Sequence, residues 1–217
     1  HNKNRPYINY SKSDNVRYVW NSDFRVTPGE LYFSNTEVNQ AEKVFKLAKK
    51  FWYEKYQEKY KGVIFFESSA TRSHRSKFEN KYKNLDWGFE NWKKLINKIS
   101  SKFLIIQSSH QNTKVLDNSF ISNKLGFRES CALMSKCDLY IGSHGGFSHV
   151  AAALDKKAVV YFGGWVSPNI LGYQTHQNLY FENSKSPCGS VGINCDHCQK
   201  AREFIKPEIF EEKILTY

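Results

Sequence analysis

Residues 139–154 constrain the fold of this chain more than any other segment, because three structural signals follow one another there. Residues 139–141 form an apolar run that is too short and too rich in β-formers for a helix, so they predict a buried strand. The glycine turn 142–146 follows, and residues 147–154 have helical composition with three consecutive alanines. A strand, a glycine turn and a helix N-terminus in this order favour an anion site, because free N–H groups and the positive dipole end converge there. The alternative is an ordinary tight turn between a strand and a helix.

The same alternation of strand and helix extends along most of the chain. Buried strands are predicted at 63–66, 103–106 and 158–162, and helices at about 34–60, 92–99, 128–136 and 207–214. Ser34 and Glu37 form a capping-box pattern at the start of the first of these helices. Strands that alternate with helices indicate an α/β fold, with a doubly wound, mostly parallel, Rossmann-like sheet. Residues 1–33 hold β-like runs at 6–10 and 16–20, which we expect to form edge strands or a linker before a domain at 34–217.

Composition narrows the class of protein. The chain has 217 residues, of which 40% are hydrophobic and 24% charged, as in folded globular proteins. No apolar run reaches the ~18 residues of a membrane span and no signal peptide opens the chain, so a cytoplasmic location is expected. The formal charge of +11 favours an anionic partner such as a nucleotide, a phosphorylated sugar or an acidic lipid surface. No nucleic-acid-binding motif accompanies that charge, and we expect no nucleic-acid partner.

Polar residues follow the first predicted strand in a pattern that suits a diphosphate. In parallel sheets, ligands bind outside the carboxyl ends of the strands. Hydroxyl and cationic groups there can donate to phosphate oxygens and supply fixed positive charge. The residues of this kind are Ser68, Ser69, Arg72, Arg75 and Lys77. The alternative is a solvated polar loop.

Further candidate ligand groups lie at other predicted strand ends and helix starts. In the glycine turn, Ser143, Gly145 and Gly146 would face a second phosphate, with the candidate catalytic residues His144 and His149 beside it. No third metal ligand lies near these histidines, which argues against a catalytic zinc ion.

Two more residues have both a ligand-binding and a structural interpretation. Trp165 would flank a base or sugar, or cover the core, and Glu129 would bind ribose hydroxyls, or simply favour its helix start. The sequence lacks the P-loop pattern, the G-x-G-x-x-G fingerprint after the first strand and the G-x-S-x-G nucleophile elbow.

Three cysteines cluster near the carboxyl end. Cys188, Cys195 and Cys198 lie within eleven residues together with His197, and a Cys-x2-Cys pair chelates a tetrahedral ion well. A structural zinc or iron site, a disulfide and free thiols are the three alternatives.

These segments together resemble glycosyltransferase family 9, the ADP-heptose:lipopolysaccharide heptosyltransferases. The resemblance rests on residues 63–69, 86–96, 128–137 and 141–154, and it concerns the carboxyl-terminal, donor-binding half of a GT-B fold. The family pattern is a strand, Asp-Thr-Gly, two residues, His and an alanine-rich helix. Gly146 and His149 match it, whereas His144 and Gly145 replace Asp and Thr. Family members often carry a cysteine-rich stretch where this chain has its cysteines.

The resemblance implies transfer of a sugar, with heptose as one option, from a nucleotide-diphosphate donor to a saccharide or lipid-linked acceptor, without a catalytic metal. The donor diphosphate would lie between Ser68 and Ser69 on one side and Gly145 and Gly146 on the other, and His144 or His149 would orient it. Because GT-B enzymes have two such domains, 1–33 would be a remnant of an acceptor-side domain that is truncated or supplied by a partner. The alternative is a non-catalytic nucleotide-sugar-binding module that needs a partner domain. Peripheral contact with the inner membrane would suit a lipid-linked acceptor.

Overall fold

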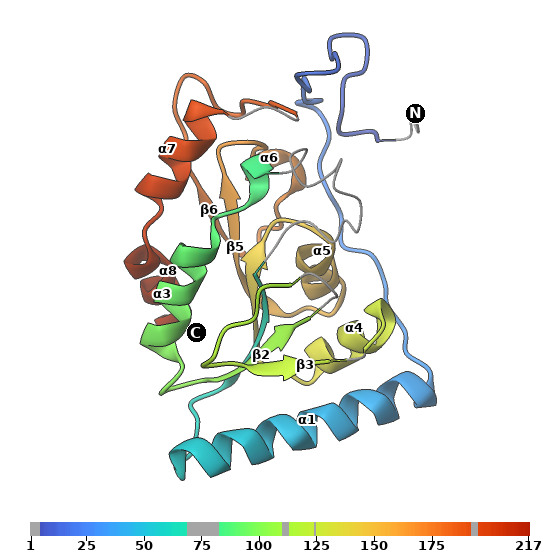
Figure 1. Cartoon of the computed structure of the whole chain (residues 1–217). Coiled ribbons are helices and arrows are strands. Elements are labelled where there is room, and N and C mark those ends of the chain that lie inside the picture. The colour runs from blue at the N-terminus through green and yellow to red at the C-terminus, as the bar shows by residue number, and fades with distance from the viewer. Residues whose placement is uncertain (1–4, 69–82, 110–112, 124, 192–194) are drawn as a thin grey trace.

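The computed structural model describes residues 5–68, 83–109, 113–123, 125–191 and 195–217. Its centre is a six-stranded sheet with the order β3-β2-β1-β4-β5-β6, in which every neighbouring pair is parallel (Figure 1). The strands are β1 (Val63–Glu67), β2 (Leu104–Ser108), β3 (Phe120–Ser122), β4 (Leu139–Ser143), β5 (Lys157–Gly163) and β6 (Gln177–Tyr180). The helical elements are α1 (Asn35–Tyr56), η1 (Lys83–Leu85), α3 (Phe89–Ile99), α4 (Phe127–Ser135), α5 (Gly146–Ala153), α6 (Pro168–Leu171), α7 (Asp196–Phe204) and α8 (Pro207–Leu215). The predicted α/β fold with a doubly wound parallel sheet is confirmed.

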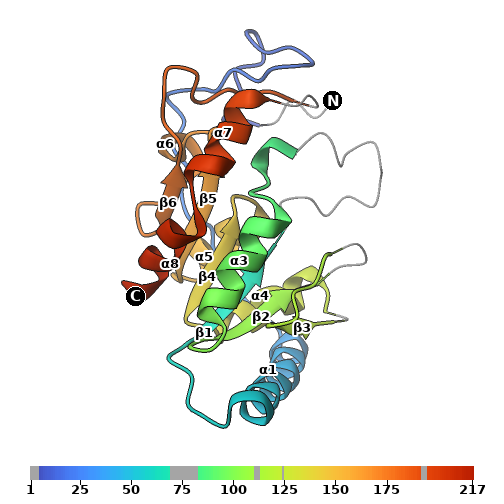
Figure 2. The same ribbon diagram turned by 60° about the vertical axis from the view of Figure 1, so that its left-hand side comes forward.

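Helices cover both faces of the sheet, as the nearly continuous apolar composition of the central strands requires. Alternate strand residues point to opposite faces, so Phe65 lies in the core under α1, α4 and α5, while Phe66 lies in the core under α3 and α8. Trp52 of α1 is buried on the first face, and Trp92 of α3 packs against Phe66 on the second with ring centroids 5.2 Å apart. Figures 1 and 2 show these layers from two directions.

The first helix begins and ends for reasons that are visible in its caps. The side chain of Ser34 accepts from the backbone N–H of Glu37, and the Glu37 carboxylate accepts from the Ser34 N–H at 2.8 Å. The predicted capping box is therefore confirmed. The helix ends four residues before Tyr60, because Gln57 adopts a left-handed conformation with φ 54°.

The outer parts of the structure differ from the sequence-based expectations. The edge strands β3 and β6 were not predicted, because each is short and only partly buried. Edge strands were one of two expectations for residues 6–10 and 16–20, and the structure does not show them. These residues form only isolated antiparallel bridges, Ile8 with Trp20 and Arg17 with Ser190. Trp20 anchors this segment by packing on Trp165 with ring centroids 4.8 Å apart.

The strand order places a topological switch point between β1 and β4. Connections leave β1 toward β2 on one side and enter β4 on the other, and in parallel sheets ligands bind at the carboxyl ends of such a pair. Glu67 and Gly142 are register partners there, which brings residue 68 beside residue 143. Among the described residues, none of the helices is both long and apolar enough to cross a membrane.

Candidate functional site

Ser68 directly follows β1 at the switch point and is held there by a glutamine that sequence reasoning missed. Its Oγ accepts a hydrogen bond from Gln107 Nε2 at 3.2 Å, and Ser68 is 6% exposed. Gln107 is itself fixed, since its Nε2 also donates to Lys114 O at 2.8 Å and its Oε1 accepts from Leu116 N at 3.0 Å. The only sequence signal for Gln107 is a polar residue at the end of an apolar strand.

Polar atoms without partners gather at this edge of the sheet. Among the described residues, the hydroxyls of Ser108 and Ser143 and both ring nitrogens of His144 are buried and make no hydrogen bond. The two serines are the last residues of β2 and β4, and the histidine follows directly. A buried polar group left unpaired costs about 1–3 kcal/mol, so a polar ligand bound at this edge would recover part of that free energy.

The turn into α5 exposes backbone to the same space. A Cβ on Gly145 would meet nothing nearer than Ser143 O at 3.9 Å, and one on Gly146 nothing nearer than Phe127 at 3.8 Å. Gly145 brings no side-chain cap to the helix, and its own N–H donates to Ser148 Oγ at 3.2 Å. Gly142 differs, because a Cβ there would collide with the Tyr140 hydroxyl. Gly145 and Gly146 therefore leave room for a ligand, whereas Gly142 is required by packing inside the strand.

The two candidate histidines occupy different environments. His144 is 7% exposed and packs against Phe162 with ring centroids 4.6 Å apart. Burial, with a smaller contribution from His149, lowers the pKa of His144 to about 3, so its imidazole is neutral near pH 7. His149 lies one helical turn beyond Gly145 and is only partly buried, and its Nδ1 is 2.8 Å from the hydroxyl of Tyr173. His149 is thus the more exposed of the two histidines.

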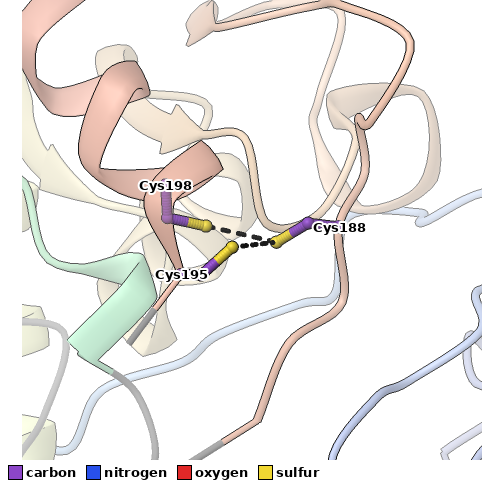
Figure 3. A group of neighbouring side chains, drawn as sticks. All are labelled: Cys188, Cys195 and Cys198. Carbon is purple, nitrogen blue, oxygen red and sulfur yellow. Dashed lines mark hydrogen bonds between the residues drawn. The ribbon is translucent and has the colours of Figure 1, made fainter. Parts of the chain in front are cut away.

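The three clustered cysteines lie close together on the loop before α7 and at its start (Figure 3). Their ligand atoms all lie within 4.8 Å of one another, with Cys188 Sγ 3.2 Å from Cys198 Sγ and 3.7 Å from Cys195 Sγ. Sulfur atoms around a tetrahedral zinc ion, at a Zn–S distance near 2.3 Å, are about 3.8 Å apart. The 3.7 Å separation is close to that value, and the 3.2 Å separation is shorter. All three are free thiols, so the structure holds no disulfide here.

His197 does not join this cysteine cluster. Its Nε2 lies 2.9 Å from Ser186 Oγ, and its Nδ1 lies 3.3 Å from Asn183 Nδ2. Adjacent positions on a helix point in different directions, which carries the His197 ring away from the sulfur atoms of Cys198 and Cys195. The described residues thus offer three sulfur ligands and no histidine ligand.

Comparison with known proteins identifies the family. The model of glycosyltransferase family 9 (heptosyltransferase) matches residues 14–200, which is most of the chain. The chain belongs to glycosyltransferase family 9. No curated protein matches the sequence closely enough to add to this assignment.

Solved structures of glycosyltransferase family 9 proteins share the fold. The ADP-heptose LPS heptosyltransferase II of E. coli superposes with a TM-score of 0.57 at 15% identity, over 86% of this chain and 52% of that one. The iron-containing dodecameric heptosyltransferase TibC, solved in complex with ADP-D-β-D-heptose, gives 0.54 at 13% identity, over 73% and 45%. Identities this low show a common fold alone. The chain spans about half the length of each of these relatives.

Two predicted ligand contacts in this glycosyltransferase family 9 chain also have structural explanations. The Glu129 carboxylate accepts from Gly126 N at 2.6 Å, which caps α4. Trp165 is 6% exposed, and its Nε1 donates to Ser190 O at 2.6 Å. These contacts account for both residue types without a ligand, and their binding roles stay predictions. Ser69, Arg72, Arg75 and Lys77 lie outside the described residues.

Proposed function

We propose that the chain binds a nucleotide-diphosphate sugar across the carboxyl ends of β1 and β4 and takes part in transferring its sugar to a saccharide or lipid-linked acceptor. Family membership supports sugar transfer as the class of reaction. The observation that supports this location is the switch point between β1 and β4, where Ser68 and the unpartnered Ser143 hydroxyl precede the open glycine turn into α5. Phosphate oxygens suit donors arranged in this way.

We infer the roles of individual residues from the charge that develops during transfer. The acceptor oxygen bonds to the anomeric carbon and gives its proton to a general base on the acceptor side, while the bond from that carbon to the phosphate oxygen breaks and the nucleoside diphosphate leaves with the electron pair. Ser68, the Gly145–Gly146 backbone and His149 would stabilise the leaving diphosphate, with help from Ser69 and the cations Arg72, Arg75 and Lys77. With these groups in place, transfer needs no metal ion at this site. His144 would act by positioning the His149 ring. The two rings pack edge to face with their centroids 5.3 Å apart.

ADP-heptose is the first donor to test, because the TibC structure contains ADP-D-β-D-heptose. Heptosyltransferase II is likewise named for an ADP-heptose donor. The replacement of the family's Asp by His144 bears on the sugar, since a neutral imidazole makes different hydrogen bonds from a carboxylate. Other ADP-sugars therefore belong in the same test.

Calorimetry and turnover separate the possible outcomes. We expect ADP and ADP-heptose to bind with a dissociation constant below 1 mM, on the scale of a ligand held by several charge-assisted hydrogen bonds. Release of ADP from the donor, with or without acceptor, would demonstrate catalysis by the chain itself. Binding without turnover would favour the module that requires an acceptor-side domain or partner, and absence of binding would reject both functions. Replacing Lys49, a half-buried residue of α1, by Ala serves as the control variant.

We also propose that Cys188, Cys195 and Cys198 hold a structural zinc or iron ion. The close approach of three thiols supports this, since neighbouring thiolates repel one another unless a cation or protons lie between them. TibC is described as iron-containing, which makes iron a candidate beside zinc. A bound ion would join the loop before α7 to that helix and would take no part in sugar transfer.

The net charge of +11 also leads us to propose weak contact with an anionic membrane surface, where a lipid-linked acceptor would be presented. Co-sedimentation with vesicles that contain an acidic phospholipid tests this contact. Binding should weaken as salt is raised and disappear with neutral vesicles, and salt-independent binding would contradict an electrostatic origin.

A further inference from the structure

Tyr173 lies beside the candidate donor site but has not been assigned any role there. It follows α6, where Gly172 ends a short turn so tight that a Cβ on it would lie 2.7 Å from Pro168 O. Its carbonyl accepts from Asn178 Nδ2 at 3.0 Å and from His176 N at 3.1 Å, and its ring packs against that of His176. The side chain is 6% exposed, so the position of its hydroxyl is set by the fold.

The contact between Tyr173 and His149 determines which nitrogen of the imidazole carries its proton. The Tyr173 hydroxyl is 2.8 Å from His149 Nδ1, and no other hydrogen bond of that hydroxyl occurs among the described residues. If Nδ1 carried the proton and donated to the tyrosine oxygen, the buried O–H would be left without an acceptor, at a cost in free energy. If the hydroxyl donates to Nδ1, both groups are satisfied and the imidazole proton resides on Nε2.

The charge states of both groups agree with this assignment. Burial raises the pKa of the Tyr173 hydroxyl above its ordinary value, so the group keeps its proton near pH 7. Burial lowers the pKa of His149, so its imidazole is neutral and has one N–H to place. The titratable groups around the pair are His144, in edge contact with His149, and His176, in edge contact with Tyr173. Burial lowers the pKa of both, so neither contributes positive charge at neutral pH.

We propose that Tyr173 is a positioning residue, which donates to His149 Nδ1 and thereby presents Nε2–H as a fixed hydrogen-bond donor to the phosphates of the donor nucleotide. Gly145 and His149 are four residues apart, so they lie on the same face of α5. The Nε2–H group would therefore lie beside the N-terminus of the helix. A neutral N–H donor fixed in this way needs no reorientation when the diphosphate binds or departs. The assignment of the tautomer stands on the contact itself, and only the destination of Nε2–H rests on the proposed function.

Nitrogen-15 NMR of the histidine rings tests the tautomer without any ligand. In the wild-type chain we expect His149 to show the neutral form with the proton on Nε2, assigned by the signal lost in His149→Gln. In Tyr173→Phe, which removes only the hydroxyl, this signal should move toward a mixture of both tautomers. Tyr60→Phe removes the hydroxyl of a half-buried tyrosine next to Trp52, after the end of α1, and should leave the signal unchanged. A proton on Nδ1 in the wild type, or an unchanged tautomer in Tyr173→Phe, would overturn the proposal. If Tyr173→Phe fails to fold, the wild-type spectrum still decides.

Binding of ADP, measured by calorimetry, tests whether His149 Nε2–H donates to the phosphates. Loss of one fixed donor should weaken ADP binding by about three- to tenfold in Tyr173→Phe. Gln keeps an N–H near the Nε2 position whereas Asn does not, so His149→Gln should bind ADP more tightly than His149→Asn. Adding Tyr173→Phe to His149→Gln should then change the affinity less than twofold. An equal effect of Tyr173→Phe in both backgrounds would refute action through His149. If the wild type binds no ADP, the proposed function fails, while the NMR result for the tautomer still stands.

Discussion

At the residue scale, Gly142 shows how closely the centre of the sheet is packed. The Tyr140 side chain folds back over this position and donates from its hydroxyl to Ser143 O at 3.2 Å. Space for that ring exists only because position 142 lacks a Cβ, and Glu67 O would also lie 3.1 Å from one. The glycine thus serves the strand that carries the site rather than the ligand itself.

Gly142→Ala should accordingly destabilise the fold. Overpacking of a filled core costs about 1–3 kcal/mol, so we expect a loss of this size in the free energy of unfolding measured with urea. Gly29→Ala is the matched control, because no atom lies within 4 Å of a Cβ there. Equal stability of the two variants would contradict the packing role.

The buried histidines make stability sensitive to acid. His144 and His176 have pKa values lowered to about 3 and about 4 by burial, against 6.5 for the free side chain. Between pH 6.5 and these values the unfolded chain takes up protons that the native chain does not, so stability falls as the pH falls.

Urea unfolding between pH 7 and pH 5 checks this sign. The free energy of unfolding should decrease toward pH 5 by up to about 1.4 kcal/mol per pH unit for each buried neutral histidine. His144→Phe, which keeps an aromatic ring beside Phe162, should flatten the slope, while replacing the exposed residue Lys46 should not. A steeper slope in His144→Phe would be inconsistent with a neutral buried imidazole.

At the element scale, α1 depends on its first turn. Ser34 and Glu37 cap each other's N–H groups, and Glu37 also pairs with Arg128 of α4. The Arg128 hydrogen bond, followed by the cap, lowers the pKa of Glu37 to about 2. The carboxylate therefore supports the helix above pH 4.5 and loses this effect as the pH falls toward 2. One turn of α1 thus fixes both the helix start and its contact with α4.

Ser34→Ala should lower the free energy of unfolding by about 1 kcal/mol, since it removes the oxygen that accepts from the Glu37 N–H. Chemical denaturation monitored by circular dichroism measures the change. The exposed residue Ser101, outside any helix or strand, provides the control, because its replacement by Ala removes no cap. A variant as stable as the Ser101→Ala chain would show that the cap contributes nothing.

At the scale of the whole molecule, the loop at residues 188–191, which carries Cys188, is hydrogen-bonded to the amino-terminal segment at residues 16–18. Tyr18 N donates to Gly189 O and Val191 N donates to Val16 O, each at 2.8 Å. Arg17 Nε also donates to Cys188 O at 2.9 Å. An ion that fixes the cysteine cluster would therefore also hold the amino-terminal segment against the domain.

Metal removal tests this connection. We expect the purified chain to hold one zinc or iron ion, measured by elemental analysis, and a strong chelator to lower the melting temperature by about 5 °C or more. Hydrogen exchange at residues 16–20 should quicken at the same time. Replacing all three cysteines by Ser should abolish the chelator effect. A metal-free native chain that chelators leave unchanged would exclude the site.

Much of the central fold was predictable from local signals. The strands β1, β2, β4 and β5 and the helices between them follow from apolar runs and helical spacing, because burial on both faces leaves a strong pattern. The short edge strands β3 and β6 have no such pattern. The bridges of the amino-terminal segment are also invisible in the sequence, since their partners lie far away along the chain.

The site divides in the same way. The sequence alone determined the glycine turn before α5, the capped start of α1, the cysteine spacing and the family, since each depends on residues that are near one another in the chain. Only the tertiary structure decided that Ser68 stands beside Ser143, that Gln107 holds Ser68, and that Tyr173 meets His149. The strand order and the packing of the connecting turns create these contacts, and neither is encoded in local spacing. The sequence therefore specified which groups could bind a donor, and the fold specified which of them meet.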